Sequence, residues 1–131
     1  MTGGSGVPQS VLVVEDERNI VESLKFLIGK AGLDVRVAYD GPTALRMIEE
    51  KAPDLLLLDI MLPGFDGFEV LRAIRNNPRR RHIRIMMLTA KGREVDRHKA
   101  TELGVDEYVT KPFSTREVLQ RVKALVGAAP G

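Results

Sequence analysis

The chain has 131 residues, of which 44% are hydrophobic and 29% charged, with a formal net charge of +2; these values are ordinary for one globular domain. It contains no cysteine, which excludes disulfides, thiol catalysis and thiolate metal sites. The N-terminus lacks a signal-peptide pattern, and no apolar run approaches the ~20 residues of a membrane span, so we expect a cytoplasmic protein with no membrane partner.

Apolar patterns along the chain predict five strands that alternate with five helices. The strands are expected, in chain order, over residues 12–14, 35–37, 55–58, 83–88 and 106–110. Apolar side chains at helical spacing predict helices over residues 20–31, 44–48, 68–74, 93–103 and 118–126. Ser114 precedes the last helix, and Glu117 three residues later completes a capping-box pattern.

This alternation predicts an α/β fold. Strands that alternate with helices form a mostly parallel, doubly wound sheet with helices on both faces, joined by right-handed crossovers. We therefore expect a three-layer arrangement of five βα units over residues 10–126. Residues 1–9 are glycine-rich and residues 127–131 are small, so both segments are expected to be tails.

Reactive side chains follow four of the predicted strands. Glu15 and Asp16 follow the first strand, and Asp59 follows a run of four leucines. Thr89 and Lys111 follow the fourth and fifth strands. Ligands of open parallel sheets bind outside the carboxyl ends of the strands. The acids, the hydroxyl and the amine are therefore expected to meet at one edge of the sheet.

These residue types suit a metal and a phosphoryl group. Glu15, Asp16 and Asp59 would repel one another in a cleft unless a cation joined them. Oxygen ligands without His or Cys favour Mg²⁺, with Mn²⁺ as a substitute. A carboxylate beside a metal and a lysine can form an aspartyl phosphate, with Lys111 and Thr89 on the phosphoryl oxygens. Each residue alone also fits an ordinary loop or strand end, but their common placement favours the phosphoryl site.

Four segments of the chain resemble the motifs of response-regulator receiver domains. They lie at residues 13–17, 58–67, 88–90 and 108–113, and the resemblance runs from Ser10 to Val126. It implies a CheY-like, two-component signalling domain with the flavodoxin-like strand order 2-1-3-4-5. The phosphoryl donor would be a sensor histidine kinase or a histidine phosphotransfer protein. Such a domain is a phosphoacceptor rather than an enzyme, limited to self-phosphorylation from small donors and slow autodephosphorylation.

The resemblance also implies a role for each acid. Asp59 would be the phosphoacceptor, Asp16 a direct Mg²⁺ ligand and Glu15 a ligand through a metal-bound water. The backbone carbonyl of Met61 would complete the protein ligands. Glu15 stands where an aspartate is commoner in the family, a change that leaves the metal site intact.

A switch follows from the same resemblance. Thr89 and Lys111 would bind the phosphoryl oxygens, and Tyr108 matches the aromatic switch position. Phosphorylation would draw Thr89 inward, and the ring of Tyr108 would move from an exposed to a buried position; a static half-buried ring is the alternative. Pro112 follows a bond that is usually cis in the family. The helix 93–103 has a thin apolar stripe and is expected to move easily; the stripe consists of Val95, Ala100 and Leu103.

Charged residues near the C-terminus resemble the dimer face of OmpR-type transcriptional regulators. The face comprises Arg97, Asp106, Glu107, Glu117, Arg121 and Lys123. Arg97 would meet Glu117 across a two-fold axis, and Glu107 would meet Arg121. Exposed pairs contribute only ~0–1 kcal/mol each, so a homodimer would be weak and phosphorylation-dependent. Ordinary solvated charge is the alternative.

Other functions remain open at this point. The chain could be the receiver of a longer transcription factor or other multidomain regulator. An aspartyl-nucleophile phosphatase of the haloacid-dehalogenase type is less favoured, because Met61 occupies the position of its second aspartate. A flavodoxin-like nucleotide-binding module is also less favoured, because this chain has no glycine-rich phosphate loop after its first strand. Basic residues gather at 79–84, but no aromatic residue interleaves them, so we expect a solvated loop and no direct nucleic-acid binding.

The lifetime of the phosphoryl group should depend on two flanking side chains. Met61 and Lys91 lie two residues after Asp59 and Thr89. Met61 has no charge with which to orient an attacking water. Hydrolysis is therefore expected to take minutes or longer.

Overall fold

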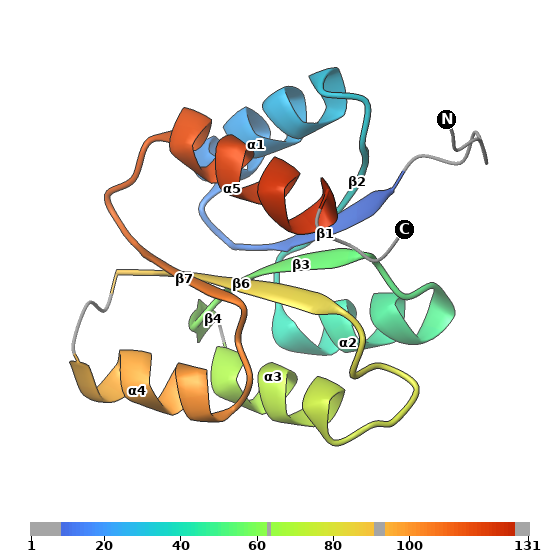
Figure 1. The fold of residues 1–131 in the computed structure, drawn as a ribbon, viewed down its shortest axis with the longest axis vertical. Coiled ribbons are helices and arrows are strands. Elements are labelled where there is room, and N and C mark those ends of the chain that lie inside the picture. The colour runs from blue at the N-terminus through green and yellow to red at the C-terminus, as the bar shows by residue number, and fades with distance from the viewer. Residues whose placement is uncertain (1–8, 63, 91–93, 128–131) are drawn as a thin grey trace.

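A computed structural model describes residues 9–62, 64–90 and 94–127 (Figure 1). Its main strands are β1 (Ser10–Val14), β2 (Asp34–Ala38), β3 (Leu55–Asp59), β6 (Arg84–Thr89) and β7 (Glu107–Thr110). A short hairpin consists of β4 (Met61–Leu62) and β5 (Phe65–Asp66). The helices are α1 (Arg18–Lys30), α2 (Gly41–Glu50), α3 (Gly67–Arg75), α4 (Glu94–Glu102) and α5 (Thr115–Gly127). Most of the two expected tails lies outside the described residues.

The five main strands form one parallel sheet in the order β2-β1-β3-β6-β7. Counted along the chain, these strands have the predicted order 2-1-3-4-5. Helices α1 and α5 cover one face, and α2, α3 and α4 cover the other (Figure 1). The predicted three-layer α/β fold is therefore confirmed.

The leucines of β3 build the centre of both hydrophobic layers. Leu56 and Leu58 belong to the cluster beneath α2 and α3, whereas Leu55 and Leu57 belong to the cluster beneath α1 and α5. All four are fully buried. A central strand covered on both faces has no polar side, which explains an unbroken leucine run. The same burial fixes the strand end that carries Asp59.

Helix α4 differs from its prediction. Val95 was expected in the buried stripe, but it is 64% exposed. Ala100 is fully buried, and Leu103, just beyond the helix, is partly buried against the core. Asp96 also lies on the buried side, so the face toward the sheet is only partly apolar. The Nζ of Lys99 lies 4.5 Å from the centre of the Phe68 ring of α3.

The capping box before α5 forms only in part. The backbone N–H groups of Arg116 and Glu117 donate to Ser114 Oγ at 3.2 and 3.4 Å. The Glu117 carboxylate pairs with Arg121 at 3.2 Å instead of completing the reciprocal bond. Ser114 therefore acts as the predicted cap, and Glu117 takes part in a surface ion pair.

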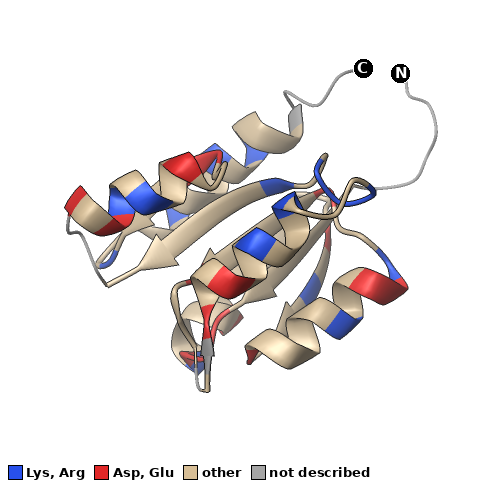
Figure 2. Ribbon diagram, turned by 90° about the horizontal axis from the view of Figure 1, so that it is seen from below, with Lys and Arg blue, Asp and Glu red and all other residues tan. Residues whose placement is uncertain are grey.

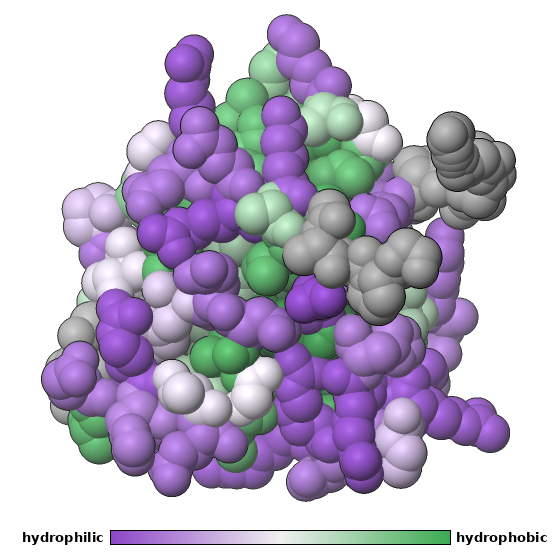
Figure 3. All heavy atoms as spheres, viewed as in Figure 1, coloured by the Kyte–Doolittle hydropathy of each residue, from purple (hydrophilic) through white to green (hydrophobic). Residues whose placement is uncertain are grey.

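The basic segment 79–84 comprises the end of the loop before β6 and the first residue of that strand, and Figure 2 shows it largely in blue. Arg80 donates to the carbonyl of Glu49 at 3.3 Å, whereas Arg79, Arg81 and His82 are exposed. The exposed residues stand at the amino end of β6, away from the acids. Figure 3 shows a mainly hydrophilic face with small, separate hydrophobic patches. Among the described helices, none is long and apolar enough to cross a membrane.

Candidate functional site

Three predicted carboxylates meet at the carboxyl ends of β1 and β3. Oxygen atoms from Glu15, Asp16 and Asp59 lie within 4.8 Å of one another. Glu15 is fully buried and Asp59 is 2% exposed, whereas Asp16 is exposed. The neighbouring strands β1 and β3 pair in parallel, which places their terminal acids side by side. The cluster is thus rooted in the core and reaches solvent through Asp16.

The Glu15 carboxylate has one well-bonded oxygen and one poorly bonded oxygen. Its Oε2 accepts the backbone N–H groups of Asp16 and Glu17 at 3.0 and 3.1 Å. Its buried Oε1 lies 2.9 Å from Lys111 Nζ but receives no well-directed hydrogen bond from the described residues. Burial raises the pKa of Glu15 to about 7, against the lowering effects of Lys111 and the backbone. Repulsion from Asp59 adds to the rise.

Both oxygens of Asp59 have donors. The backbone N–H of Met61 donates to Oδ1 at 3.0 Å, and Lys111 Nζ donates to Oδ2 at 3.2 Å. The Met61 side chain is 53% exposed, so it forms an uncharged part of the rim. Lys91, the other expected flanking residue, lies outside the described residues.

Lys111 connects the end of β7 to the acids. Its Nζ lies 2.6 Å from Glu17, 2.9 Å from Glu15 and 3.2 Å from Asp59. Burial alone lowers the pKa of Lys111, but the three carboxylates outweigh it and hold the pKa above its usual value. The Lys111 N–H donates to the Thr89 carbonyl at 2.6 Å. The bond from Lys111 to the exposed Pro112 is cis, as the resemblance implied.

The donor set fits a hard divalent cation. All candidate side-chain ligands are carboxylate oxygens, which suit Mg²⁺ or Mn²⁺ better than softer metals. Glu15 Oε1 is buried without a well-directed donor, a state that a cation would relieve. Met61, whose carbonyl was the fourth expected ligand, lies next to the cluster through its bond to Asp59.

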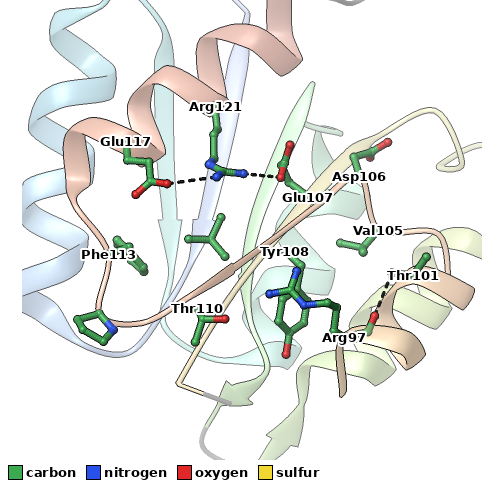
Figure 4. Close-up of a pocket in the computed structure, with 12 residues that line it drawn as sticks. Arg97, Thr101, Val105, Asp106, Glu107, Tyr108, Thr110, Phe113, Glu117 and Arg121 are labelled. Carbon is green, nitrogen blue, oxygen red and sulfur yellow. Dashed lines mark hydrogen bonds and ion pairs between the residues drawn. The ribbon is translucent and has the colours of Figure 1, made fainter. Parts of the chain in front are cut away.

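Two of the three predicted switch residues, Thr89 and Tyr108, are buried. Thr89 ends β6, directly beside Thr110 of β7, and is fully buried. The Tyr108 ring is 8% exposed, and the Arg97 guanidinium lies over it, 4.7 Å from the ring centre (Figure 4). In this structure Tyr108 thus occupies a buried position, rather than the exposed one expected before phosphorylation.

Five of the six predicted dimer-face residues line a hollow of ≈ 550 Å³ between α4, β7 and α5 (Figure 4). These are Arg97, Asp106, Glu107, Glu117 and Arg121. Arg121 pairs with Glu107 at 2.6 Å and with Glu117 at 3.2 Å within the same chain. Three charges expected to pair across a two-fold axis therefore already have partners in the monomer.

Asp106 and Lys123 contribute less to this face than the other four predicted residues. Asp106 lies at the rim, but Figure 4 shows its carboxylate turned away from the hollow. Asp106 Oδ2 accepts the Ile85 N–H at 2.7 Å and pairs with Arg75 at 3.2 Å. Lys123 is exposed on α5 and is not part of the lining. Asp106 thus joins β6 to α3, a role that its sequence position did not suggest.

Two residues of the site were not predicted. Glu17 is the nearest carboxylate to Lys111 among the described residues, although in the sequence it is only the last of three consecutive acidic residues, 15–17. Gly67 begins α3, and a Cβ there would lie 2.5 Å from the Asp59 carbonyl oxygen. A glycine directly before an apolar helical stripe was the only sequence signal for such a close approach.

Comparisons with known proteins agree with this geometry. The response regulator receiver domain model matches residues 11–123. DrrB of Thermotoga maritima, an OmpR/PhoB homolog, is 30% identical with a TM-score of 0.84, covering 92% of this chain and 54% of DrrB. CheY4 of Vibrio cholerae is 25% identical with a TM-score of 0.84, covering 91% and 99% of the two chains.

A third similar structure contains a metal. It is the Mn(2+)-bound form of response regulator Rcp1, 27% identical with a TM-score of 0.80, covering 92% of this chain and 94% of Rcp1. The family match covers most of the chain, and the acid cluster of Glu15, Asp16 and Asp59 lies within the matched residues. The chain therefore belongs to the response regulator receiver domains of two-component signalling.

Proposed function

We propose that Asp59 accepts a phosphoryl group from the phosphohistidine of a sensor kinase or a histidine phosphotransfer protein. The N–P bond would break with its electron pair going to the imidazole, while an Asp59 oxygen forms the new O–P bond. The observation that carries the proposal is the donation of Lys111 Nζ to Asp59 at 3.2 Å, beside two further carboxylates. Phosphoryl transfer depends mainly on such positioning and charge neutralisation.

Mg²⁺ is the proposed cofactor, and Mn²⁺ should replace it. Glu15, Asp16, Asp59 and the Met61 carbonyl would hold the ion, which would neutralise charge on the acids and on the phosphoryl oxygens. The Mn(2+)-bound form of Rcp1 supports a divalent cation in this family. Glu15 and Asp59 are held by backbone donors, so their orientation does not depend on the ion.

Phosphorylation would act on the surface of α4, β7 and α5. Thr89 and Lys111 would contact the phosphoryl oxygens, and Tyr108 and Pro112 would respond to that change. Arg97 covers the Tyr108 ring, so a change in the ring would alter a residue of the outer face. A weak phosphorylation-dependent homodimer on this face is our proposal, with no direct nucleic-acid contact by this domain. An uncharged Met61 at the rim supports a phosphoryl lifetime of minutes or longer.

Phosphorylation with a labelled small phosphodonor tests the acceptor. With Mg²⁺ present, the wild type should gain one acid-stable, base-labile phosphoryl group, and Asp59→Asn should gain none. EDTA should abolish labelling of the wild type. Stable labelling of Asp59→Asn would refute the assignment of the acceptor.

The proposed dimer needs a separate measurement. Size-exclusion chromatography with and without Mg²⁺ and fluoroberyllate should show earlier elution of the activated wild type. Thr89→Ala should bind the phosphoryl analogue without the same shift, because the hydroxyl that couples the two regions is gone. An unchanged elution volume of the wild type in both states would count against this dimer.

A further inference from the structure

Glu17 competes with Asp59 for the Lys111 ammonium. The Glu17 contact is 2.6 Å and the Asp59 contact is 3.2 Å. Both satisfy hydrogen-bond geometry, so the two carboxylates attract the same ammonium, and the shorter contact is the one to Glu17. Glu17 is thus the closest anionic partner of the lysine in this structure.

The position of Glu17 in the chain shows that this contact is not ordinary helix capping. Glu17 is the N-cap of α1, yet its side chain accepts no bond from the first turn. An N-cap side chain normally accepts a backbone N–H of that turn. The Glu17 carboxylate instead reaches across from the end of β1 to the end of β7. Its own N–H donates to Glu15 Oε2, which ties it to the acid cluster.

Glu17 also stands apart from the metal cluster. The oxygens that lie within 4.8 Å of one another belong to Glu15, Asp16 and Asp59 and not to Glu17. Lys111 is therefore shared between the cluster and a carboxylate outside it. The Glu17 side chain is 58% exposed, whereas that of Lys111 is only 13% exposed. The lysine therefore has its shorter contact with a carboxylate at the rim of the site and its longer contact with the buried Asp59.

We infer that Glu17 is a positioning residue that holds Lys111 partly away from Asp59 and thereby slows phosphoryl acceptance. This inference rests on the proposed function, because it requires Lys111 to contact the phosphoryl group. When that group forms, Lys111 must exchange the Glu17 carboxylate for a phosphoryl oxygen. Loss of the Glu17 charge removes this competition and also one negative charge facing an anionic phosphodonor.

The test compares Glu17→Gln with Glu22→Gln, which removes one charge from an exposed position of α1 outside the ion pairs of Lys111. Rates of labelling by acetyl phosphate with Mg²⁺ are measured first. Glu17→Gln should be labelled about two- to five-fold faster than wild type, the size expected of a partly exposed ion pair. Glu22→Gln should match the wild type, and Glu17→Asp should lie between wild type and Glu17→Gln.

A second measurement separates positioning of Lys111 from general charge. The affinity for fluoroberyllate should rise about two- to five-fold in Glu17→Gln. The rise should vanish in a Lys111→Met background, where no ammonium remains to be released. Equal behaviour of Glu17→Gln and Glu22→Gln, slower labelling of Glu17→Gln, or a gain that survives Lys111→Met would each overturn the inference. A wild type that takes up no label would instead refute the proposed function, and the inference with it.

Discussion

Gly67 is the residue at which the backbone of the site tolerates least change. A Cβ at this position would lie 2.5 Å from the Asp59 carbonyl oxygen and 2.7 Å from Ile60 Cα. Real Cβ atoms essentially never approach that closely, so the chain must move. The atoms in the way are backbone atoms at the end of the fully buried strand β3, and no rotamer change can relieve the clash. The Gly67 N–H also donates to the Ile60 carbonyl at 2.9 Å, which fixes the approach.

Gly67→Ala is therefore expected to destabilise the fold. Overpacking a well-packed site costs about 1–3 kcal/mol, and backbone obstruction favours the upper end. Alanine regains up to about 1 kcal/mol of helix propensity relative to glycine, although less at a helix start. The expected net loss in free energy of unfolding is about 2 kcal/mol. The forced shift of the Asp59 backbone should also slow phosphoryl acceptance.

Gly29 provides a matched control. It lies in α1, and a Cβ there would meet nothing within 4 Å. Gly29→Ala should raise the free energy of unfolding by up to about 1 kcal/mol, the helix-propensity difference. Urea unfolding followed by circular dichroism measures both variants against the wild type, with an unchanged m-value as the check of two-state behaviour. The steric argument fails if Gly67→Ala unfolds at the same or a higher urea concentration than the wild type.

Two further predictions concern charged groups. Arg75 donates to the carbonyls of Gly104, Arg81 and Ile83. Arg75→Met should therefore lower the free energy of unfolding, measured in urea, by about 2–3 kcal/mol, and Arg75→Lys should restore only part of that loss. Unchanged stability of Arg75→Met would contradict this. The pKa of Glu15 is raised from 4.5 to about 7, so the native state binds more protons than the unfolded state between these values. The metal-free protein should therefore lose stability from this group as pH rises from about 4.5 to 7. Mg²⁺ needs the ionised carboxylate, so the rise in Tm on adding Mg²⁺ should be larger at pH 8 than at pH 6; an equal rise at both would refute the link.

The elements that the sequence predicts well are those whose burial is uniform. In β3 both faces of the strand are covered, so the pattern of leucines reports the environment directly. Helix α4 was predicted less accurately because only one side meets the sheet and that side includes Asp96, so Val95 could not be placed from its hydrophobicity. The β4–β5 hairpin was missed because two-residue strands have no periodicity to detect.

In the site, the sequence predicts which residues meet at the sheet edge, but not which partners their long side chains choose. The carboxyl ends of parallel strands share an edge, so the meeting of Asp59 with Lys111 follows from the topology alone. The choice of partners by long side chains does not follow from topology. Glu17 turns toward Lys111 and Asp106 turns toward Arg75, and both directions depend on contacts between segments far apart in the chain. Intrachain pairing of Arg121 with Glu107 belongs to the same class.

The acids of this site are held together by the core and not by their own interactions. Four carboxylates gather at the edge of the sheet, and Lys111 forms ion pairs with three of them. Burial is the main cause of the raised pKa of Glu15, and repulsion from Asp59 adds to it. Such repulsion between like charges is a cost to the fold. The burial of β1 and β3 on both faces offsets it, because the strand ends cannot separate without opening the core. A cation or a phosphoryl group therefore enters a site whose geometry is already fixed, and what it changes is how the Lys111 ammonium is shared.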